Sequence, residues 1–439
     1  MADNKRFRNI YFGWWTVLAG GLLSLWGHGF YTFGFSALFK PISLELNFGR
    51  AATSVPASIG RLQGGFEAPL SGWITDKYGP RLIVVFGVFL MSLSLILMYY
   101  VNSLWAFYLL WGVLLGSGIN VATAVPMDTA IANWFVKKRG TAVSIKWVLS
   151  GLGGVILLNV IAWLISTEGW RMTCVIGGLV MGIVGLPLAW FCLRNHRPEY
   201  YGLLPDGAMV DSETKESGRI VEKGVEYAAG VGEVEFTLRQ AMKTRSYWIL
   251  LLAAACNGLA GPPLYIHIVP LLDDMGYNQL VAAGMLSLMI GIGLPMRFVG
   301  GFLADRVSKR RMRFLIMGAY FLEASGVIVF LLNQTTPAIY AFLILFGLGA
   351  GSVLGIMNPL RARYFGRKAL GSIAGASSLI MMPIGMAAPI YFGWVYDTTG
   401  DYMTAFTVLA TLLSCATVAA SFILPPKPPA QITDVHTIV

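Results

Sequence analysis

Ionisable side chains interrupt several long apolar stretches of this sequence. Five of them lie deep within such stretches: Arg61, Glu67, Asp128, Lys146 and Arg297. If these stretches cross a lipid bilayer, each charge costs from about 2.5 to more than 10 kcal/mol at the centre unless it is paired or hydrated. Residues of this kind therefore indicate a site that binds a charged ligand, moves a proton or pairs two helices.

The two arginines are the strongest candidates for binding an anion. Arg297 precedes Asp305 by eight residues, about 12 Å along a helix, which is near the middle of a hydrocarbon layer about 30 Å thick. A planar guanidinium matches a carboxylate through two parallel hydrogen bonds. We therefore predict that Arg297 binds an anionic substrate, with a structural ion pair as the alternative. Arg61, fifteen residues before Asp76, is either a second anchor for the anion or the partner of an acid on another helix.

Three further charges, Glu67, Asp128 and Lys146, lie at similar depths on the second, fourth and fifth apolar stretches. One interpretation is a structural network inside the N-terminal half of the chain. The other is that Glu67 or Asp128 carries a proton, because burial and a neighbouring Lys can tune the pKa of a carboxylate. Glu323, in the ninth stretch, is expected to be structural.

Neutral polar residues complete the set of candidate substrate contacts: His28, Asn120, Asn257 and Tyr391. His28 could relay a proton because histidine titrates near neutral pH, although a hydrogen-bonded core histidine is the alternative. The two asparagines and Tyr391 could bind a hydroxyl or carbonyl, but hydrogen bonds between helices explain them equally well. His267, near the end of the seventh stretch, is a weaker relay candidate.

The composition is that of a membrane protein. Of 439 residues, 56% are hydrophobic and only 12% are charged, about half the share usual in soluble domains. A membrane-spanning helix needs about 20 mostly apolar residues, and twelve stretches meet this need, which predicts an all-α polytopic membrane protein. They lie at 11–38, 52–75, 82–101, 104–133, 141–165, 171–193, 246–271, 280–304, 313–332, 337–360, 370–395 and 402–424.

One long polar stretch divides the twelve predicted helices into two sets of six. We predict an N-terminal bundle over 1–193, a cytoplasmic linker over 194–245, a C-terminal bundle over 246–424 and a tail over 425–439. Folds built from two such repeats place the substrate near the midplane of the membrane.

The distribution of basic residues predicts the topology. With the N-terminus in the cytoplasm, 26 of the 32 Lys and Arg residues fall in cytoplasmic segments. Only Lys40, Arg50 and Arg171 fall in outer segments, and three more lie within spans. The positive-inside rule therefore favours an inner (plasma) membrane protein with both termini in the cytoplasm. The same clustering explains the net charge of +10 without nucleic acid as a partner.

The two halves repeat each other weakly. Residues 72–77, Gly-Trp-Ile-Thr-Asp-Lys, resemble residues 301–306, Gly-Phe-Leu-Ala-Asp-Arg, and Gly169, Met172 and Thr173 match Gly400, Met403 and Thr404. The first segment extends to Gly72-x-x-x-Asp76-Lys77-x-Gly79-Pro80-Arg81, which resembles the loop motif of the major facilitator superfamily. The resemblance implies two pseudo-symmetric six-helix bundles. It also implies that Asp76, Arg81, Asp305 and Arg306 are gating residues, which hold helices together in one state and release them in another.

Within that superfamily the sequence resembles the monocarboxylate transporter and oxalate:formate antiporter group. The matching segments are Tyr11-Phe12-Gly13-Trp14-Trp15, Phe33-Gly34-Phe35, Phe39-Lys40-Pro41-Ile42, residues 134–140 and Pro389-x-x-x-Gly393-x-x-x-Asp397. The group implies that the substrate carboxylate contacts Arg297. The chain departs from the group at four points. The stretch 369–394 lacks the Lys that oxalate transporters have there, and the interior of the first stretch lacks the Lys of animal lactate carriers. Gly293 stands one turn before Arg297 where those carriers have Asp, and the antiporter motif Gly-Pro-x-x-Gly-Gly is absent from residues 140–154. The proton route of those carriers is therefore not transferred.

These observations predict a secondary transporter of small monocarboxylate anions, lactate-like or pyruvate-like, that works by alternating access with proton symport. The alternatives are an organic-anion or dicarboxylate exchanger, a drug-type efflux carrier and, more distantly, a membrane sensor that does not transport. No nucleotide-binding, zinc-protease or Cys-x-x-Cys motif is present in the sequence. We therefore expect no enzymatic activity, no cofactor and no bound metal, and a monomer whose partners are the substrate, a proton and the bilayer.

Overall fold

The fold is entirely helical over the residues that the structure describes. The structure is a computed structural model that describes residues 11–135, 138–196, 198–207, 236–365 and 370–426. In these ranges, nine helical segments are long and apolar enough to cross a membrane. One of them, Thr141–Cys192, has 52 residues, more than twice the ~20 needed for one crossing. The predicted all-α polytopic class is confirmed.

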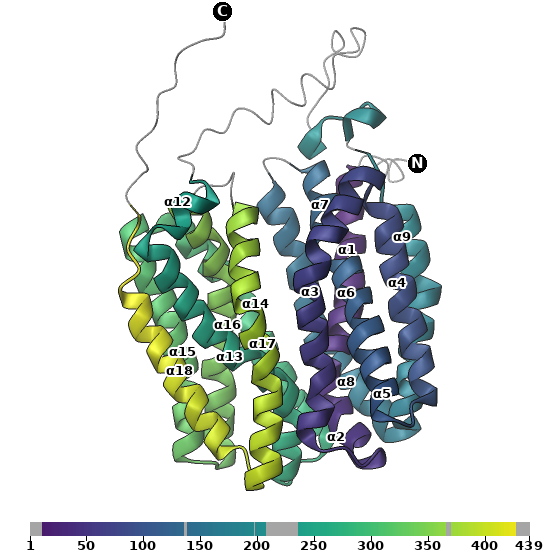
Figure 1. Cartoon of the computed structure of the whole chain (residues 1–439), viewed down its shortest axis with the longest axis vertical. Helices are drawn as coiled ribbons and strands as arrows, with labels where there is room; N and C mark the ends of the chain where they lie inside the picture. Colours follow the sequence, from purple (N-terminus) through teal and green to yellow (C-terminus); the bar gives the residue numbers. More distant parts are fainter. Residues whose placement is uncertain (1–10, 136–137, 197, 208–235, 366–369, 427–439) are drawn as a thin grey trace, which may run out of the picture. The chain divides into compact units, whose positions relative to one another are not determined.

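The N-terminal helices follow one another with short connections (Figure 1). A π-helical turn joins the first two helices into one rod, and similar irregular turns interrupt the fourth and sixth crossings. The elements are α1 (Phe12–His28), η2 (Gly29–Gly34), α2 (Phe35–Glu45), α3 (Arg50–Tyr78), α4 (Pro80–Leu97), η3 (Met98–Tyr100), α5 (Leu104–Phe107), η4 (Tyr108–Leu115), α6 (Gly116–Thr123), α7 (Val125–Trp134), α8 (Arg139–Val180), η5 (Met181–Gly185) and α9 (Leu186–Cys192).

The C-terminal helices are longer and less interrupted. A five-residue helix, α12 (Leu238–Met242), precedes them, and Thr237 and Gln240 cap it with reciprocal hydrogen bonds, which satisfy backbone N–H groups at a helix start. The elements that follow are α13 (Arg245–Asp274), α14 (Gln279–Arg306), η8 (Lys309–Arg311), α15 (Met312–Leu332), α16 (Thr336–Phe365), α17 (Leu370–Thr399) and α18 (Met403–Ser421).

Two glycines confirm the repeat seen in the sequence. Gly169 breaks α8 with φ 78°, and Gly400 ends the turn before α18 with φ 79°. Both values lie in the left-handed region, which glycine adopts at no steric cost. The break at Gly169 separates the fifth crossing from the sixth, as the turn at Gly400 separates α17 from α18. The matched sequence positions therefore have the same backbone role in both halves.

The contacts divide the described chain into two compact units that do not follow the sequence halves. The first unit comprises Met1–Val231, Gly261–Gly291 and Met382–Ala405, and the second comprises Gly232–Ala260, Ile292–Met381 and Phe406–Val439. The C-terminal part of α13, the N-terminal part of α14 and the C-terminal part of α17 thus pack with the N-terminal helices. The division into bundles at the linker remains a prediction.

In the second unit, small residues bring α14 and α16 close together. A Cβ atom on Gly293 would lie 3.0 Å from the carbonyl oxygen of Gly347, and the backbone of Arg297 packs directly against Gly355. Close backbone approach through small residues is the usual way in which membrane helices associate. The packing fixes the position of α14 at the level of Arg297.

We expect Gly79→Ala to destabilise the protein more than Gly169→Ala. Both glycines have positive φ, 84° and 78°, which costs a side-chain-bearing residue about 1–2 kcal/mol. A Cβ on Gly79 would also lie 2.8 Å from Cα of Asn195, whereas a Cβ on Gly169 meets nothing within 4 Å. Thermal unfolding of the purified variants in detergent measures the difference. Equal melting temperatures would show that Asn195 can move away from the added methyl group without loss of stability.

Candidate functional site

Arg61 lies inside the first unit and bonds to a backbone carbonyl. Its Nη1 donates a hydrogen bond to the carbonyl oxygen of Gly385, at 3.1 Å. Among the described residues, no carboxylate forms an ion pair with Arg61. A carbonyl oxygen orients a guanidinium but leaves its positive charge uncompensated. Arg61 therefore retains the charge that an anion would neutralise.

Tyr31, on η2, was not recognised from the sequence as part of this site. Its hydroxyl group lies within electrostatic range of Arg61, is buried, and has no hydrogen-bond partner among the described residues. It also lies directly against Gly60, where a side chain would overlap the hydroxyl. A buried donor without a partner costs about 1–3 kcal/mol, so Tyr31 and Arg61 together offer two donors to a ligand.

Glu67 belongs to a hydrogen-bonded chain that joins α3 to α6. The hydroxyl of Ser117 donates to one carboxylate oxygen, and Asn120 donates to the other at 3.2 Å. Asn120 donates also to the carbonyl of Gly60, at 3.0 Å, and Gln63 donates to Ser117, at 3.2 Å. Asn120, a predicted substrate contact, is therefore engaged with Glu67, and no Lys or Arg of the described residues forms an ion pair with this acid.

Asp128 and Lys146 form an ion pair between α7 and α8. The two groups are 2.6 Å apart, and Lys146 donates also to the carbonyl of Thr123, at 2.8 Å. The Lys146 side chain is fully buried while that of Asp128 is 37% exposed. The ammonium lies 4.0 Å from the ring centre of Trp147, which adds a cation–π contact. Lys146 is thus fully compensated by the protein, as a structural network requires.

The second unit contains two predicted substrate contacts, Arg297 and Asn257, and the predicted structural acid Glu323. Arg297 is half-buried on α14. On α13, Asn257 donates a 2.5 Å hydrogen bond to Glu323 of α15, whose side chain is 1% exposed. Asn257 therefore solvates a buried acid, and Glu323 forms no ion pair among the described residues.

The remaining predicted residues are dispersed. On α1, Nδ1 of His28 lies 3.1 Å from the carbonyl of Ser24, which fits a hydrogen-bonded core histidine. Tyr391 packs its ring near Trp394 on α17. Arg81 stacks on Trp190, with 4.3 Å between the guanidinium and the ring centre, and Arg306 stacks on Phe302, at 3.9 Å. The side chains of the other two predicted gating residues, Asp76 and Asp305, lie outside the described part.

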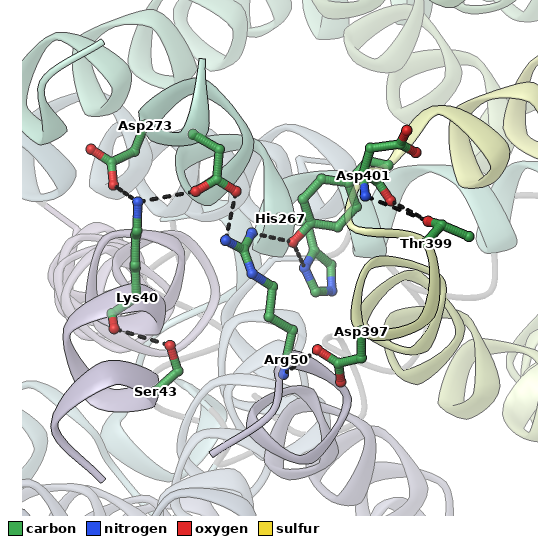
Figure 2. A network of polar contacts seen from close by, with 10 residues as sticks. Lys40, Ser43, Arg50, His267, Asp273, Asp397, Thr399 and Asp401 are labelled. Carbon is green, nitrogen blue, oxygen red and sulfur yellow. Dashed lines mark hydrogen bonds and ion pairs between the residues drawn. The ribbon is translucent and has the colours of Figure 1, made fainter. Parts of the chain in front are cut away.

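A network of ion pairs closes the first unit at the end opposite the loop that contains Gly79. We call this end the distal end; α2 lies there, at the bottom of Figure 1. Figure 2 shows Lys40 of α2 against Asp273 of α13 and Arg50 beside His267. Lys40 pairs also with Asp274, at 3.0 Å, and Arg50 pairs with Asp274, at 2.5 Å. Since Lys40 and Arg50 come from the N-terminal helices and the acids from α13, the network joins segments far apart in sequence.

Asp397 of α17 completes this network, which we call the distal latch. Its carboxylate accepts hydrogen bonds from the backbone N–H of Arg50, at 3.0 Å, and of Ala51, at 2.9 Å. These are N–H groups of the first turn of α3, which have no partner within the helix and favour an anion. The guanidinium of Arg50 also lies over the ring of Tyr396, at 3.6 Å. Asp397 therefore binds α17 to the start of α3.

From the latch towards the middle of α3, one face of α3 packs along α17. A Cβ on Gly393 would lie 2.6 Å from the backbone nitrogen of Ala51, so only glycine permits this approach. One to two turns further, Ser58 donates to the carbonyl of Met386, at 2.7 Å, and Arg61 follows with its bond to Gly385. The spacing of Ser58 and Arg61 from Arg50 places all three on one helix face. We call this contact the α3–α17 seam.

The charges of the latch stabilise one another. Desolvation opposes the charged form of Lys40, but its hydrogen bonds to Asp273 and Asp274 outweigh this effect and raise the pKa of Lys40. Partial burial likewise opposes the charge of Arg50, but Tyr402 and Asp274 outweigh it and raise the pKa of Arg50. Both groups therefore remain charged throughout the physiological pH range.

The latch was not predicted as a unit, although the sequence contained a signal for it. The three basic residues assigned to outer segments, Lys40, Arg50 and Arg171, all form ion pairs with acids at the distal end. Arg171 pairs with Glu45, at 2.8 Å. The sparse basic residues of the distal segments could have been matched with acids at helix ends, but the sequence does not say which acid each one meets.

Long apolar helices with charged side chains in their interior are those of a multi-pass membrane protein. The chain belongs to the Major Facilitator Superfamily, whose sequence model matches residues 21–389. Proteins of this family are transporters and not enzymes, as predicted. The resemblance stated from the motifs is confirmed at the level of the family and of its relatives.

Two relatives and one solved structure show how far the similarity extends. Monocarboxylate transporter 12-B of Danio rerio is 25% identical over 358 residues, which cover 77% of this chain and 72% of the relative. The oxalate:formate antiporter of Oxalobacter formigenes is 25% identical over 407 residues, covering 88% and 85%. The crystal structure of a D-xylose-proton symporter matches with a TM-score of 0.66 at 16% identity, covering 93% of this chain and 97% of that one, and shows the shared fold.

We expect Arg50→Gln to open the distal latch. The reporter is Ser58→Cys in a chain whose four native cysteines are replaced, since Ser58 is 1% exposed within the seam. Loss of charge-assisted bonds worth about 1.4 kcal/mol raises the open population, and therefore the rate of labelling by a polar maleimide, by roughly tenfold.

The matched control is Arg171→Gln. It removes an ion pair at the same end, but this pair joins α8 to α2 and does not involve α13 or α17. We expect its labelling rate to equal that of the unsubstituted reporter protein. An equal rate in Arg50→Gln would mean that Arg50 does not hold the seam closed.

Proposed function

We propose that this protein is a secondary transporter of small monocarboxylate anions of the lactate or pyruvate type, which works by alternating access and moves a proton with the anion. The observation that carries the anionic class is Arg61, a guanidinium inside apolar helices with a carbonyl oxygen but no described carboxylate as partner. The carboxylate class is supported by the names of two relatives, a monocarboxylate transporter and an oxalate:formate antiporter.

In this proposal Arg297 binds the substrate carboxylate. Its depth on α14 is near the middle of the bilayer, and the contact of its backbone with Gly355 fixes the helix at that level. Asn120, Asn257, His28 and Tyr391 are the proposed neutral contacts, and Tyr31 joins them because its hydroxyl has no partner among the described residues. A neutral proton-and-anion pair crosses an apolar barrier at lower cost than a bare anion.

The second candidate function is exchange of dicarboxylates. It is favoured by the presence of a second intramembrane guanidinium, Arg61, in addition to Arg297. Oxalate and lactate distinguish the two functions: a dicarboxylate exchanger takes up labelled oxalate in exchange for internal oxalate, whereas a monocarboxylate symporter accumulates lactate under an inward proton gradient.

The proposed location is the inner (plasma) membrane, with a monomer whose two termini lie in the cytoplasm. The excess of basic residues in the segments on that side supports this orientation. A tag on the C-terminus should resist a protease added to intact cells, and its removal would contradict the orientation.

We expect Arg297→Ala to abolish uptake of labelled lactate. The assay uses proteoliposomes with an imposed inward proton gradient. Loss of a charge-assisted bond of about 1.5–3 kcal/mol lowers the affinity by about ten- to 150-fold. Arg297→Lys should retain part of the uptake because it keeps the charge but loses the planar fork. Arg171→Ala, which removes a distal basic residue, is the control, and unchanged uptake in Arg297→Ala would remove Arg297 from the site.

We expect Glu67→Gln and Asp128→Asn to differ in their effects on coupling. Glu67 is bound by neutral donors, so Gln keeps the packing and should abolish proton-driven accumulation while preserving lactate exchange at equal pH. Asp128 compensates a fully buried Lys146, so Asn leaves a buried charge unpaired. This variant should lose thermal stability and both transport modes together. Intact accumulation in Glu67→Gln would exclude Glu67 as the proton carrier.

A further inference from the structure

His267 is buried within the distal latch and is bonded on both ring nitrogens. Its side chain is 1% exposed. Nε2 lies 3.1 Å from the carbonyl oxygen of Pro389 and 3.2 Å from the hydroxyl of Ser54, and Nδ1 lies 3.0 Å from the hydroxyl of Tyr402. All these residues belong to the first unit. Figure 2 shows the ring beside Arg50, at the centre of the network.

The partners define which ring nitrogen carries the hydrogen. The carbonyl of Pro389 can only accept, and the hydroxyl of Ser54 already donates to the carbonyl of Arg50, at 2.8 Å. Nε2 must therefore be the donor. With the hydrogen on Nε2, Nδ1 of the neutral ring is an acceptor. The hydroxyl of Tyr402, which accepts from Nη1 of Arg50, at 2.8 Å, then donates its own hydrogen to Nδ1. The closed latch thus requires a neutral imidazole whose Nδ1 is an acceptor.

A proton on Nδ1 is incompatible with this arrangement. It would leave the hydroxyl hydrogen of Tyr402 without its acceptor, and it would place an imidazolium one hydroxyl group away from the guanidinium of Arg50. Both effects act inside a site that excludes water, where an unpaired donor and two like charges are costly. The closed latch therefore excludes the proton.

The other groups around His267 do not compensate this charge. From α2, the ring of Phe39 packs against the imidazole, and from α17 the ring of Phe392 does so. The charged groups of the latch are Lys40 and Arg50 with three acids, Asp273, Asp274 and Asp397. These acids are already engaged by the two basic side chains and by the start of α3.

We propose that His267 is a proton-binding site which is accessible only when the distal latch is open, so that proton binding favours the open state. The proton comes from water at the distal end, binds Nδ1 and returns to water, or passes to a deeper acceptor, before the latch can close. A ligand that binds one of two conformations shifts the population towards that conformation. The inference does not depend on the identity of the transported anion.

The test measures latch opening as a function of pH in nanodiscs, where both faces are in contact with the buffer. The reporter is Ser58→Cys in the cysteine-replaced chain, and each rate is divided by that of Glu168→Cys, an exposed distal position, to correct for thiol reactivity. A hydrated imidazole titrates near pH 6.5. Lowering the pH from 7.5 to 5.5 should therefore raise the corrected rate by about tenfold. Free carboxylic acids, lysine and arginine in water titrate outside this interval.

The decisive variant is His267→Gln, whose amide can still donate to Pro389 but cannot take up a proton. We expect its labelling to be slow at both pH values. His196→Gln, a substitution of an exposed histidine outside the latch, should keep the tenfold response, and His267→Asn replaces His267→Gln if the latter is not monodisperse. The proposal is wrong if the reporter protein shows no response, if His267→Gln retains it, or if His267→Gln labels rapidly at both pH values.

Discussion

The structure depends on the high cost of charge in an apolar helix bundle. Lys146 illustrates one solution, because a fully buried ammonium is compensated by Asp128, a carbonyl and an aromatic ring. Glu67 illustrates another, because neutral donors solvate it on both oxygens. Arg61 differs from both, since among the described residues its guanidinium bonds to a carbonyl oxygen and to no carboxylate. Its charge is therefore one that an anion would neutralise.

In the proposed transport cycle, the distal latch has to hold one end closed and yet release it. Exposed ion pairs contribute about 0–1 kcal/mol each, and those of the latch are only partly buried, with side-chain exposures between 12% and 29%. A fully buried network would be too costly to break in each cycle. Several weak bonds of this kind, together with the Asp397 contacts to α3, sum to the few kcal/mol that a ligand can overcome.

The sequence predicted the parts of the structure that depend on one helix at a time. Apolar length defines each crossing, and the matched Gly169 and Gly400 have the same backbone conformation. The features that the sequence did not predict were contacts between helices. Nothing in the sequence shows that Ser117 of α6 meets Glu67 of α3, because the rotation of each helix about its axis is set by packing. Tyr31 was missed for the same reason, since a tyrosine in an apolar span is ordinary until its hydroxyl is seen to lack a partner.

The motif Pro389-x-x-x-Gly393-x-x-x-Asp397 links the latch to the site of Arg61. Each of its three residues makes a contact of the first unit: Pro389 accepts from His267, Gly393 allows α17 to touch Ala51, and Asp397 binds the start of α3. The repeat of four places them on one face of α17. The same seam ends at Gly385, whose carbonyl holds Arg61.

Because one segment of α17 presents all these groups, separation of α17 from α3 would break the Asp397 contacts and the bond between Gly385 and Arg61 together. The carbonyl of Gly385 and a substrate carboxylate compete for the same guanidinium. An anion that binds Arg61 better when this carbonyl is withdrawn must, by linkage, favour the open latch. In the proposed transport cycle, closure of the seam would weaken anion binding by the same factor.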